Sequence, residues 1–120
     1  MALFQTSLVS LMHKRLEYLS KRTQVLTENI ARADIPGNLR KDLKPFRELV
    51  RKKSLHALKN SITSDPLRLD IDGKDIKEFK TEVEREMEIL EASHNSINHQ
   101  ALIEILSNMH RLYKTAIARS

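Results

Sequence analysis

The segment Asn29–Gly37, with the sequence NIARADIPG, is the feature that most constrains how this chain folds. Pro36 fixes its own φ and disfavours the helical region for Ile35, while Gly37 permits the positive φ that the third position of a type II turn requires. Only one other glycine occurs in the 120 residues, so this helix-breaking segment is a specific feature of the chain. The segment therefore predicts that a helix ends here and that the backbone then turns sharply.

A long amphipathic helix is predicted before this turn, from about Leu3 to Ala33. Its apolar residues recur at alternating spacings of four and three, with Thr23 as one polar position, which is typical of a coiled-coil seam. The seam residues are Met12, Leu16, Leu19, Leu26 and Ile30. A helix of this length requires a packing partner.

A second long helix is predicted from Asp75 to the C-terminus, capped by Asp75 with Glu78 three residues later. Periodic stretches beyond about 25 residues indicate a coiled coil, a repeat or a membrane span, and the many charges here exclude a span. The seam residues expected on this helix are Val83, Met87, Leu90, Ile97 and Ile105. We expect Met12, Leu19, Leu26 and Ile30 to pair with Val83, Leu90, Ile97 and Ile105.

The middle of the chain predicts a short basic helix that starts at Pro45, a residue tolerated at the first helical position. Phe46, Leu49, Val50 and Leu58 share one side of it, and 61–73 is predicted to be an extended or mobile loop. The expected fold is therefore all-α: a coiled-coil helix over 1–34, a turn, short helix and loop over 35–74, and a coiled-coil helix over 75–120, in one structural domain. The terminal helices are expected to pair as an antiparallel hairpin.

Both terminal helices carry more apolar surface than a single facing helix covers. Residues off the main seams include Val9, Leu11, Val25, Ile89, Leu102, Ile103, Leu106 and Ile117. Exposed apolar surface of this extent indicates contacts with other chains. The alternative is a small monomeric three-helix bundle with loose seams.

Charge is distributed in two opposed blocks. Residues 40–59 carry eight Lys or Arg against two acids, and residues 60–91 carry ten acids against five bases. Two interpretations remain open: the blocks are solvated faces, or they meet within a subunit or between neighbours. Nucleic-acid binding is not favoured, because the basic block has one aromatic residue and the acidic block repels phosphate.

No catalytic, cofactor-binding or metal-binding site is predicted. The chain has no cysteine, and its single ExxH unit, Glu91 with His94, lacks the second unit that a di-iron site needs. Two glycines cannot build a phosphate-binding loop or a dinucleotide fingerprint. An enzyme is therefore not expected, and neither is a cofactor.

The first 15 residues, MALFQTSLVSLMHKR, place their charges after a short apolar run, which is the wrong order for a cleaved signal peptide. No apolar stretch approaches the roughly 20 residues that a membrane-spanning helix needs. We therefore expect no direct membrane insertion, and export without a cleaved signal if the chain leaves the cytoplasm.

The turn also resembles the motif NIANxDTPGY, with which the N-terminal helix of flagellar basal-body rod proteins ends. The matching residues are Asn29, Ile30, Ala31, Ala33, Asp34, Pro36, Gly37, Arg40 and Asp42, while Arg32, Ile35 and Asn38 depart from the motif. A weaker resemblance to the proximal-rod members lies in VEREM at 83–87 and KTAI at 114–117. The residues expected to fix the exit of the first helix are Asn29, Ile30, Asp34, Pro36 and Gly37.

The resemblance implies a structural subunit of the bacterial flagellar rod in the periplasm, needed for flagellum assembly and motility. It implies contacts with copies of the chain, with other rod proteins, with a small adaptor at the membrane ring and with the flagellar export apparatus. The alternative, from the exposed seams alone, is a soluble helical adaptor or chaperone-like module that binds a partner helix in its groove.

Overall fold

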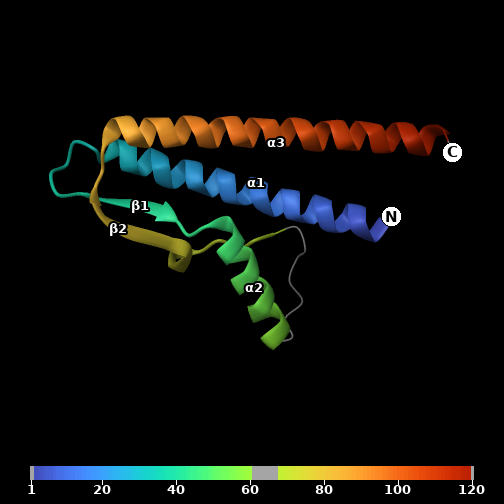
Figure 1. Cartoon of the computed structure of the whole chain (residues 1–120), viewed down its shortest axis with the longest axis horizontal. Helices are drawn as coiled ribbons and strands as arrows, with labels where there is room; N and C mark the ends of the chain where they lie inside the picture. Colours follow the sequence, from blue (N-terminus) through green and yellow to red (C-terminus); the bar gives the residue numbers. More distant parts are fainter. Residues whose placement is uncertain (1, 61–67, 120) are drawn as a thin grey trace.

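The computed structural model describes residues 2–60 and 68–119, with side chains over 8–56 and 68–119. Three helices and a small sheet follow one another along the chain (Figure 1). The elements are α1 (Ala2–Ala31), β1 (Leu39–Leu43), α2 (Phe46–Asn60), the 3₁₀ turn η1 (Gly73–Asp75), β2 (Ile76–Glu82) and α3 (Arg85–Arg119). The expectation of an all-α fold is corrected: the protein is mostly helical, and it also contains a two-stranded sheet.

The elements lie in three layers, with α1 between α3 and the sheet (Figure 1). Helices α1 and α3 run antiparallel, are in contact over part of their length and diverge toward the end that holds both termini. The molecule is long and flat, with extents of 62 × 35 × 15 Å. Figure 1 shows α2 projecting away from these layers.

The helix stop lies where the sequence predicts it. Helix α1 ends at Ala31, and the amide of Asn38 then donates to the carbonyl of Ile35 at 3.4 Å. Pro36 and Gly37 occupy the two central positions of this turn, and Gly37 has a φ of +75°. Pro36 excludes the mirror-image turn, so the type II turn is confirmed.

The segment Ile76–Glu82 was expected to be the first part of the C-terminal helix and is instead strand β2. It pairs antiparallel with β1, with Lys41 opposite Glu78 and Leu43 opposite Ile76. Asp75 does not cap a long helix: Asp72 is the cap, and Asp75 is the third residue of η1, in a reciprocal capping box. The pairing with β1 overrides the helical spacing of the apolar residues, because strand formation depends strongly on tertiary context.

Helix α2 begins immediately after Pro45, which agrees with the expected start of the short basic helix. Its fourth residue, Leu49, is fully buried, with Phe46 and Val50 half-buried beside it. The side chain of Leu58 and the part of the expected loop at 61–67 lie outside the described residues.

The core is a small apolar cluster centred on α1. Its buried members are Tyr18, Leu19, Val25, Leu43, Leu49 and Leu69, so it draws on α1, β1, α2 and the segment before η1. Of α3, only Leu102 packs against this cluster among the described residues. The attachment of α3 to the other layers therefore depends on polar contacts as well.

Candidate functional site

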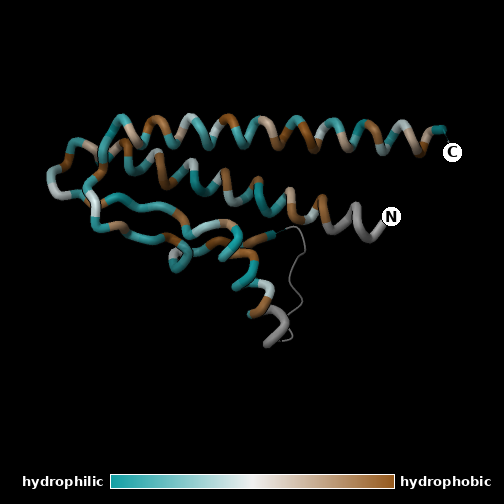
Figure 2. The backbone as a smooth tube through the Cα atoms, viewed as in Figure 1, coloured by the Kyte–Doolittle hydropathy of each residue, from teal (hydrophilic) through white to brown (hydrophobic). Residues whose placement is uncertain are grey.

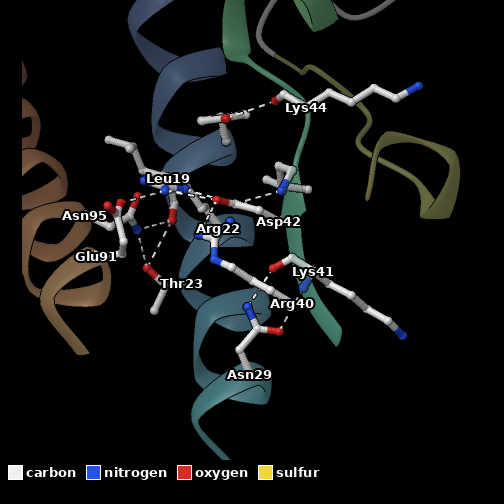
Figure 3. Close-up of polar contacts among 12 residues, drawn as sticks. Leu19, Arg22, Thr23, Asn29, Arg40, Lys41, Asp42, Lys44, Glu91 and Asn95 are labelled. Carbon is white, nitrogen blue, oxygen red and sulfur yellow. Dashed lines mark hydrogen bonds and ion pairs between the residues drawn. The ribbon is translucent and has the colours of Figure 1, made fainter. Parts of the chain in front are cut away.

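A partly buried network of charged and amide side chains joins α1, β1 and α3. We call it the junction network, and its members are Arg22, Asn29, Arg40, Asp42, Glu88 and Glu91. Asn29, Asp42 and Glu88 are buried, with exposed fractions of 4%, 6% and 1%. Figure 3 shows part of this network between α1 and β1.

Asp42 on β1 is held by two arginines. Arg22 on α1 donates from Nε to Oδ1 and from a terminal nitrogen to Oδ2 of Asp42, both at 3.0 Å. Arg40 donates to the same Oδ2 at 2.9 Å, and the amide of Leu43 donates to Oδ1 at 2.7 Å. The bidentate contact of Arg22 and the single hydrogen bonds from Arg40 and Leu43 together fix this carboxylate in one orientation.

Arg22 also reaches the opposite layer, because it donates to Oε2 of Glu91 on α3 at 2.9 Å. One guanidinium on the central helix therefore bridges β1 and α3. Such a planar, five-donor group is suited to two carboxylates at once.

Glu88 makes the second bridge from α3. Its Oε1 accepts from Nε of Arg40 at 2.5 Å, and its Oε2 accepts from Nδ2 of Asn29 at 3.1 Å. The side-chain amide of Asn29 also binds the backbone of β1. It donates to the carbonyl of Lys41 at 2.6 Å and accepts from the backbone N–H of Lys41 at 3.3 Å (Figure 3). Asn29 thereby satisfies the edge of β1 that faces α1, where no strand can pair.

The electrostatics of the network favour the charged forms of Arg22, Arg40 and Asp42. Burial alone would raise the pKa of Asp42, but the hydrogen bonds and charge of Arg22, the amide of Leu43 and the hydrogen bond of Arg40 outweigh it and lower that pKa. The hydrogen bond to Asp42 is the main cause that raises the pKa of Arg22, against the opposing effect of burial. For Arg40, burial acts to lower the pKa, yet Asp42 and Glu88 together raise it.

Asn95, which follows Glu91 by one helical turn on α3, is a further buried amide between α1 and α3. Nδ2 of Asn95 donates to the carbonyl of Leu19 at 2.8 Å and to Oγ1 of Thr23 at 2.7 Å (Figure 3). Asn95 is fully buried, and its Oδ1 is the one buried side-chain polar atom in the described part of the chain that has no hydrogen-bond partner. A single polar pair at such a position fixes the register of one helix on another.

The segment before β2 is tied down by a separate carboxylate. Oδ2 of Asp75 lies 2.9 Å from Nζ of Lys53 on α2 and accepts from the amide of Asp72 at 3.0 Å. Burial acts to raise the pKa of Asp75, but the amide of Asp72 and the ammonium of Lys53 lower it overall. Glu17 on α1 accepts from the amides of Leu69 and Asp70 at 2.5 and 3.0 Å, which anchors the same segment to the central helix.

The residues expected to fix the helix exit take different places. Asn29 is buried and binds β1 and α3, whereas Ile30 is half-buried near the end of α1. Asp34 is exposed and forms an ion pair with Arg85 at 2.6 Å, while Pro36 and Gly37 form the exposed turn. The turn is therefore connected to the start of α3 by a surface ion pair and by the hydrogen bond from the amide of Val83 to the carbonyl of Asn38 at 3.0 Å.

The expected apolar pairing of the two seams is not formed in the single chain, which is a correction. On α1, Leu19 and Leu26 are buried, and Met12, Leu16 and Ile30 are half-buried. Val83 precedes α3 and is half-buried, but Met87, Leu90, Ile97 and Ile105 are exposed by 50%, 47%, 64% and 49%. The face of α3 that contacts α1 instead presents Glu88, Glu91 and Asn95.

The reason for this difference is the phase of α3. Glu88, Glu91 and Asn95 recur at spacings of three and four, so they form one helix face in their own right. Their partners on α1 are Asn29, Arg22 and Thr23, whose hydrogen bonds select this face over the neighbouring apolar one. Sequence reasoning missed this face; polar residues at helical spacing on both helices were the signal that could have revealed it.

The apolar face of α3 therefore lies open. We call it the α3 stripe and define it by Met87, Leu90, Ile97, Ile105 and Leu112, the last 68% exposed. Figure 2 shows apolar residues recurring along the whole of α3. Among the described residues, no helix combines the length and the apolarity that crossing a membrane demands.

Comparison with known protein families finds no family model that matches this chain. A comparison with curated proteins likewise finds no match.

Proposed function

We propose that this chain is a structural subunit of the bacterial flagellar basal-body rod, of the proximal, FlgB-like type. In this proposal it assembles with copies of itself and with other rod proteins through its terminal helices. Its place is the periplasmic rod, next to the membrane-ring adaptor, and it arrives through the flagellar export apparatus without a cleaved signal peptide. Its role is mechanical: it supports assembly of the flagellum and therefore motility.

The observation that carries the proposal is the α3 stripe. Five large apolar side chains, exposed by 47% to 68%, follow one face of a 35-residue helix. An exposed row of large apolar side chains of this length is unusual on a protein that acts alone and marks a contact with another protein. The turn at Ile35–Asn38 supports the proposal further, since it ends α1 at the place where the resemblance to rod proteins implies a stop.

The finer architecture that we propose is a coiled-coil-like hairpin of α1 and α3 that is completed by neighbouring subunits. The polar contacts from Asn29–Glu88 to Thr23–Asn95 hold the two helices together in their turn-proximal part. Toward the termini the helices diverge (Figure 1). Helices of neighbouring copies would cover the α3 stripe and stiffen this open end, and a non-closing contact of this kind builds a tube.

The test is incorporation into basal bodies. A tagged chain is expressed in its own organism, in a strain without the native copy, and basal bodies are purified. The chain is expected to fractionate with them and to restore swimming. A chain that stays in the soluble fraction in a small complex of fixed stoichiometry would instead identify a helical adaptor.

Variants of the α3 stripe make this test specific. Ile97→Asp with Leu112→Asp places two charges on the stripe, at positions 64% and 68% exposed. We expect this variant to keep its fold and to be lost from basal bodies. Ser96→Asp with Ser107→Asp is the matched control, because both serines are exposed on the same helix and outside the stripe.

A further inference from the structure

Helix α2 is anchored near its beginning, and its described side chains after Lys53 are exposed. Leu49 is fully buried and Lys53 pairs with Asp75. In contrast, Leu55 is 57% exposed, and Figure 1 shows the helix leaving the three layers at a steep angle. A helix of 15 residues in water depends on packing for most of its stability. A surface that covers the projecting part would therefore stabilise it.

The exposed side of α2 is basic. Arg47 and Arg51 lie one turn apart, and Lys52 and Leu55 adjoin them, all exposed. Glu48 is the one acid on this side among residues 46–56. We call Arg47, Arg51 and Lys52 the basic face; within the described residues none of the three forms an ion pair.

A complementary surface lies where β2 passes into α3. Glu82, Glu84 and Glu86 are exposed within five residues of one another, and in the described part of the chain none forms an ion pair. The base between them, Arg85, is engaged by Asp34 at 2.6 Å. We call these three glutamates the acidic corner.

The two surfaces do not meet within one subunit. The acidic corner lies at the closed end of the α1–α3 pair, next to the turn, while α2 projects from the far end of the sheet (Figure 1). Within the subunit, the basic and acidic blocks touch through Arg40–Glu88 and Lys53–Asp75, and these contacts leave the basic face and the acidic corner unused.

We propose that the basic face of one copy binds the acidic corner of the next, in a head-to-tail contact between identical chains. This inference rests on the proposed function in one respect, the assembly of the chain with copies of itself. The contact is heterologous, so it repeats without closing and suits a filament. Complementary charges of this kind set the register and partner of an interface and speed its formation.

A nucleic acid is a less suitable occupant of the basic face. Between residues 46 and 56 the exposed side of α2 is mostly charged, with Ser54, Leu55 and His56 beside the charges and no exposed Phe, Tyr or Trp to stack on a base. Glu48 within that side also opposes a phosphate backbone. A second copy brings the three carboxylates of the acidic corner, which complement the charges of the basic face.

The test is a charge swap, followed by light scattering and sedimentation of the full chain. Arg47→Glu with Arg51→Glu makes both surfaces of one variant acidic, and Glu82→Lys with Glu84→Lys makes both surfaces of a second variant basic. Each variant alone should lose self-association by at least about tenfold, because like charges then face each other. An equimolar mixture should restore it, because each basic surface again meets an acidic one.

Arg111→Glu with Lys114→Glu is the matched control for the first variant, since it changes net charge equally at exposed positions outside both surfaces and outside the α3 stripe. It should associate as the wild type does. Raising the salt from about 50 mM to about 500 mM should weaken wild-type association, because the Debye length shrinks. Circular dichroism checks that every variant keeps its helices.

Three results would overturn the inference: a wild-type chain that stays monomeric at low salt, an equal loss in the control, or a mixture that does not recover. Binding of a short DNA duplex without self-association would assign the basic face to nucleic acid instead. The inference and the proposed function fail separately. If the chain enters basal bodies but the charge swap does not change its self-association, only the head-to-tail contact is refuted. If the charge swap changes self-association as expected but the chain is absent from basal bodies, only the assignment to the rod is refuted.

Discussion

Nε of Arg40 lies 2.5 Å from Oε1 of Glu88, and the Glu88 side chain is only 1% exposed. This contact joins a residue of the short strand β1 to the first turns of α3, 48 positions later. Glu88 also accepts from Asn29, so one carboxylate holds together the three layers of the molecule. The fold depends on this polar connection because little apolar surface of α3 reaches the core.

Replacing Glu88 by alanine is expected to destabilise the protein by about 3 kcal/mol, since it removes the acceptor of Arg40 Nε and one of the two acceptors of Asn29 Nδ2 in a largely buried site. Urea denaturation at neutral pH measures the change in the free energy of unfolding. Glu84→Ala, on an exposed side chain of the same segment, is the control and should stay within about 0.5 kcal/mol of the wild type. Equal stabilities of the two variants would contradict the central role of Glu88.

The pH dependence of stability should follow Asp42. Its pKa is lowered in the folded state, where its arginine partners and the Leu43 amide outweigh burial, so its contribution is present above the unfolded value of about 3.9. That contribution is lost as the pH falls through the lower, folded pKa. Asp42→Asn should therefore be less stable than the wild type at pH 7, and the gap should shrink below about pH 4.

The measurement for Asp42 is the urea midpoint at intervals between neutral and acid pH. Asp34→Asn serves as the control, because the Asp34 carboxylate is 81% exposed and its ion pair with Arg85 lies at the surface. Surface pairs of this kind contribute at most about 1 kcal/mol. A constant gap between wild type and Asp42→Asn down to the acid limit would show that the ionised carboxylate does not stabilise the fold.

The helices, the turn and the start of α2 could be predicted because each depends on local signals. Pro36 with Gly37 defines the turn, and Pro45 precedes α2. The strands could not be predicted in this way. Ile76 and Phe79 fit a helical spacing, and only the pairing of this segment with β1 makes it a strand.

The orientation of α3 was harder to predict than its existence. The α3 stripe is the face that a coiled-coil pattern selects, yet over its first turns the helix presents Glu88, Glu91 and Asn95 to α1. Hydrophobic spacing alone predicts which residues share a face, but the choice of the buried face depends on partners that come from distant parts of the chain. Thr23 and Asn29 are such partners here. In the sequence, the sign of them is that Thr23 is a polar residue within the apolar seam of α1.

The stability of the fold is expected to depend on the amide group of Asn95 as a hydrogen-bond donor. Asn95→Asp keeps the size of the side chain but replaces the group that donates to the Leu19 carbonyl and to Thr23 by an acceptor. A fully buried, incompletely paired carboxylate should cost about 3 kcal/mol or more in the free energy of unfolding. Asn98→Asp is the matched control on the exposed side of the same helix, and it should unfold at nearly the wild-type urea concentration.

Gly37 tests the turn itself. A Cβ added there meets no atom within 4 Å, so any cost of substitution comes from the backbone φ of +75° and not from a clash. Valine at this position should destabilise the chain by about 1 to 2 kcal/mol, because residues with a β-branched side chain rarely adopt this region. Asparagine, which tolerates a positive φ, should cost clearly less.

The pair Gly37→Val and Gly37→Asn also separates the turn's structural role from its role in assembly. If the exit direction of α1 matters for packing between subunits, Gly37→Val should reduce incorporation into basal bodies and swimming, while Gly37→Asn should leave both near the wild-type level. Urea denaturation of the same two variants gives the cost of strain independently. Wild-type swimming in Gly37→Val, together with a measured loss of stability, would mean that the turn fixes the fold of the monomer but does not set the geometry of an assembly.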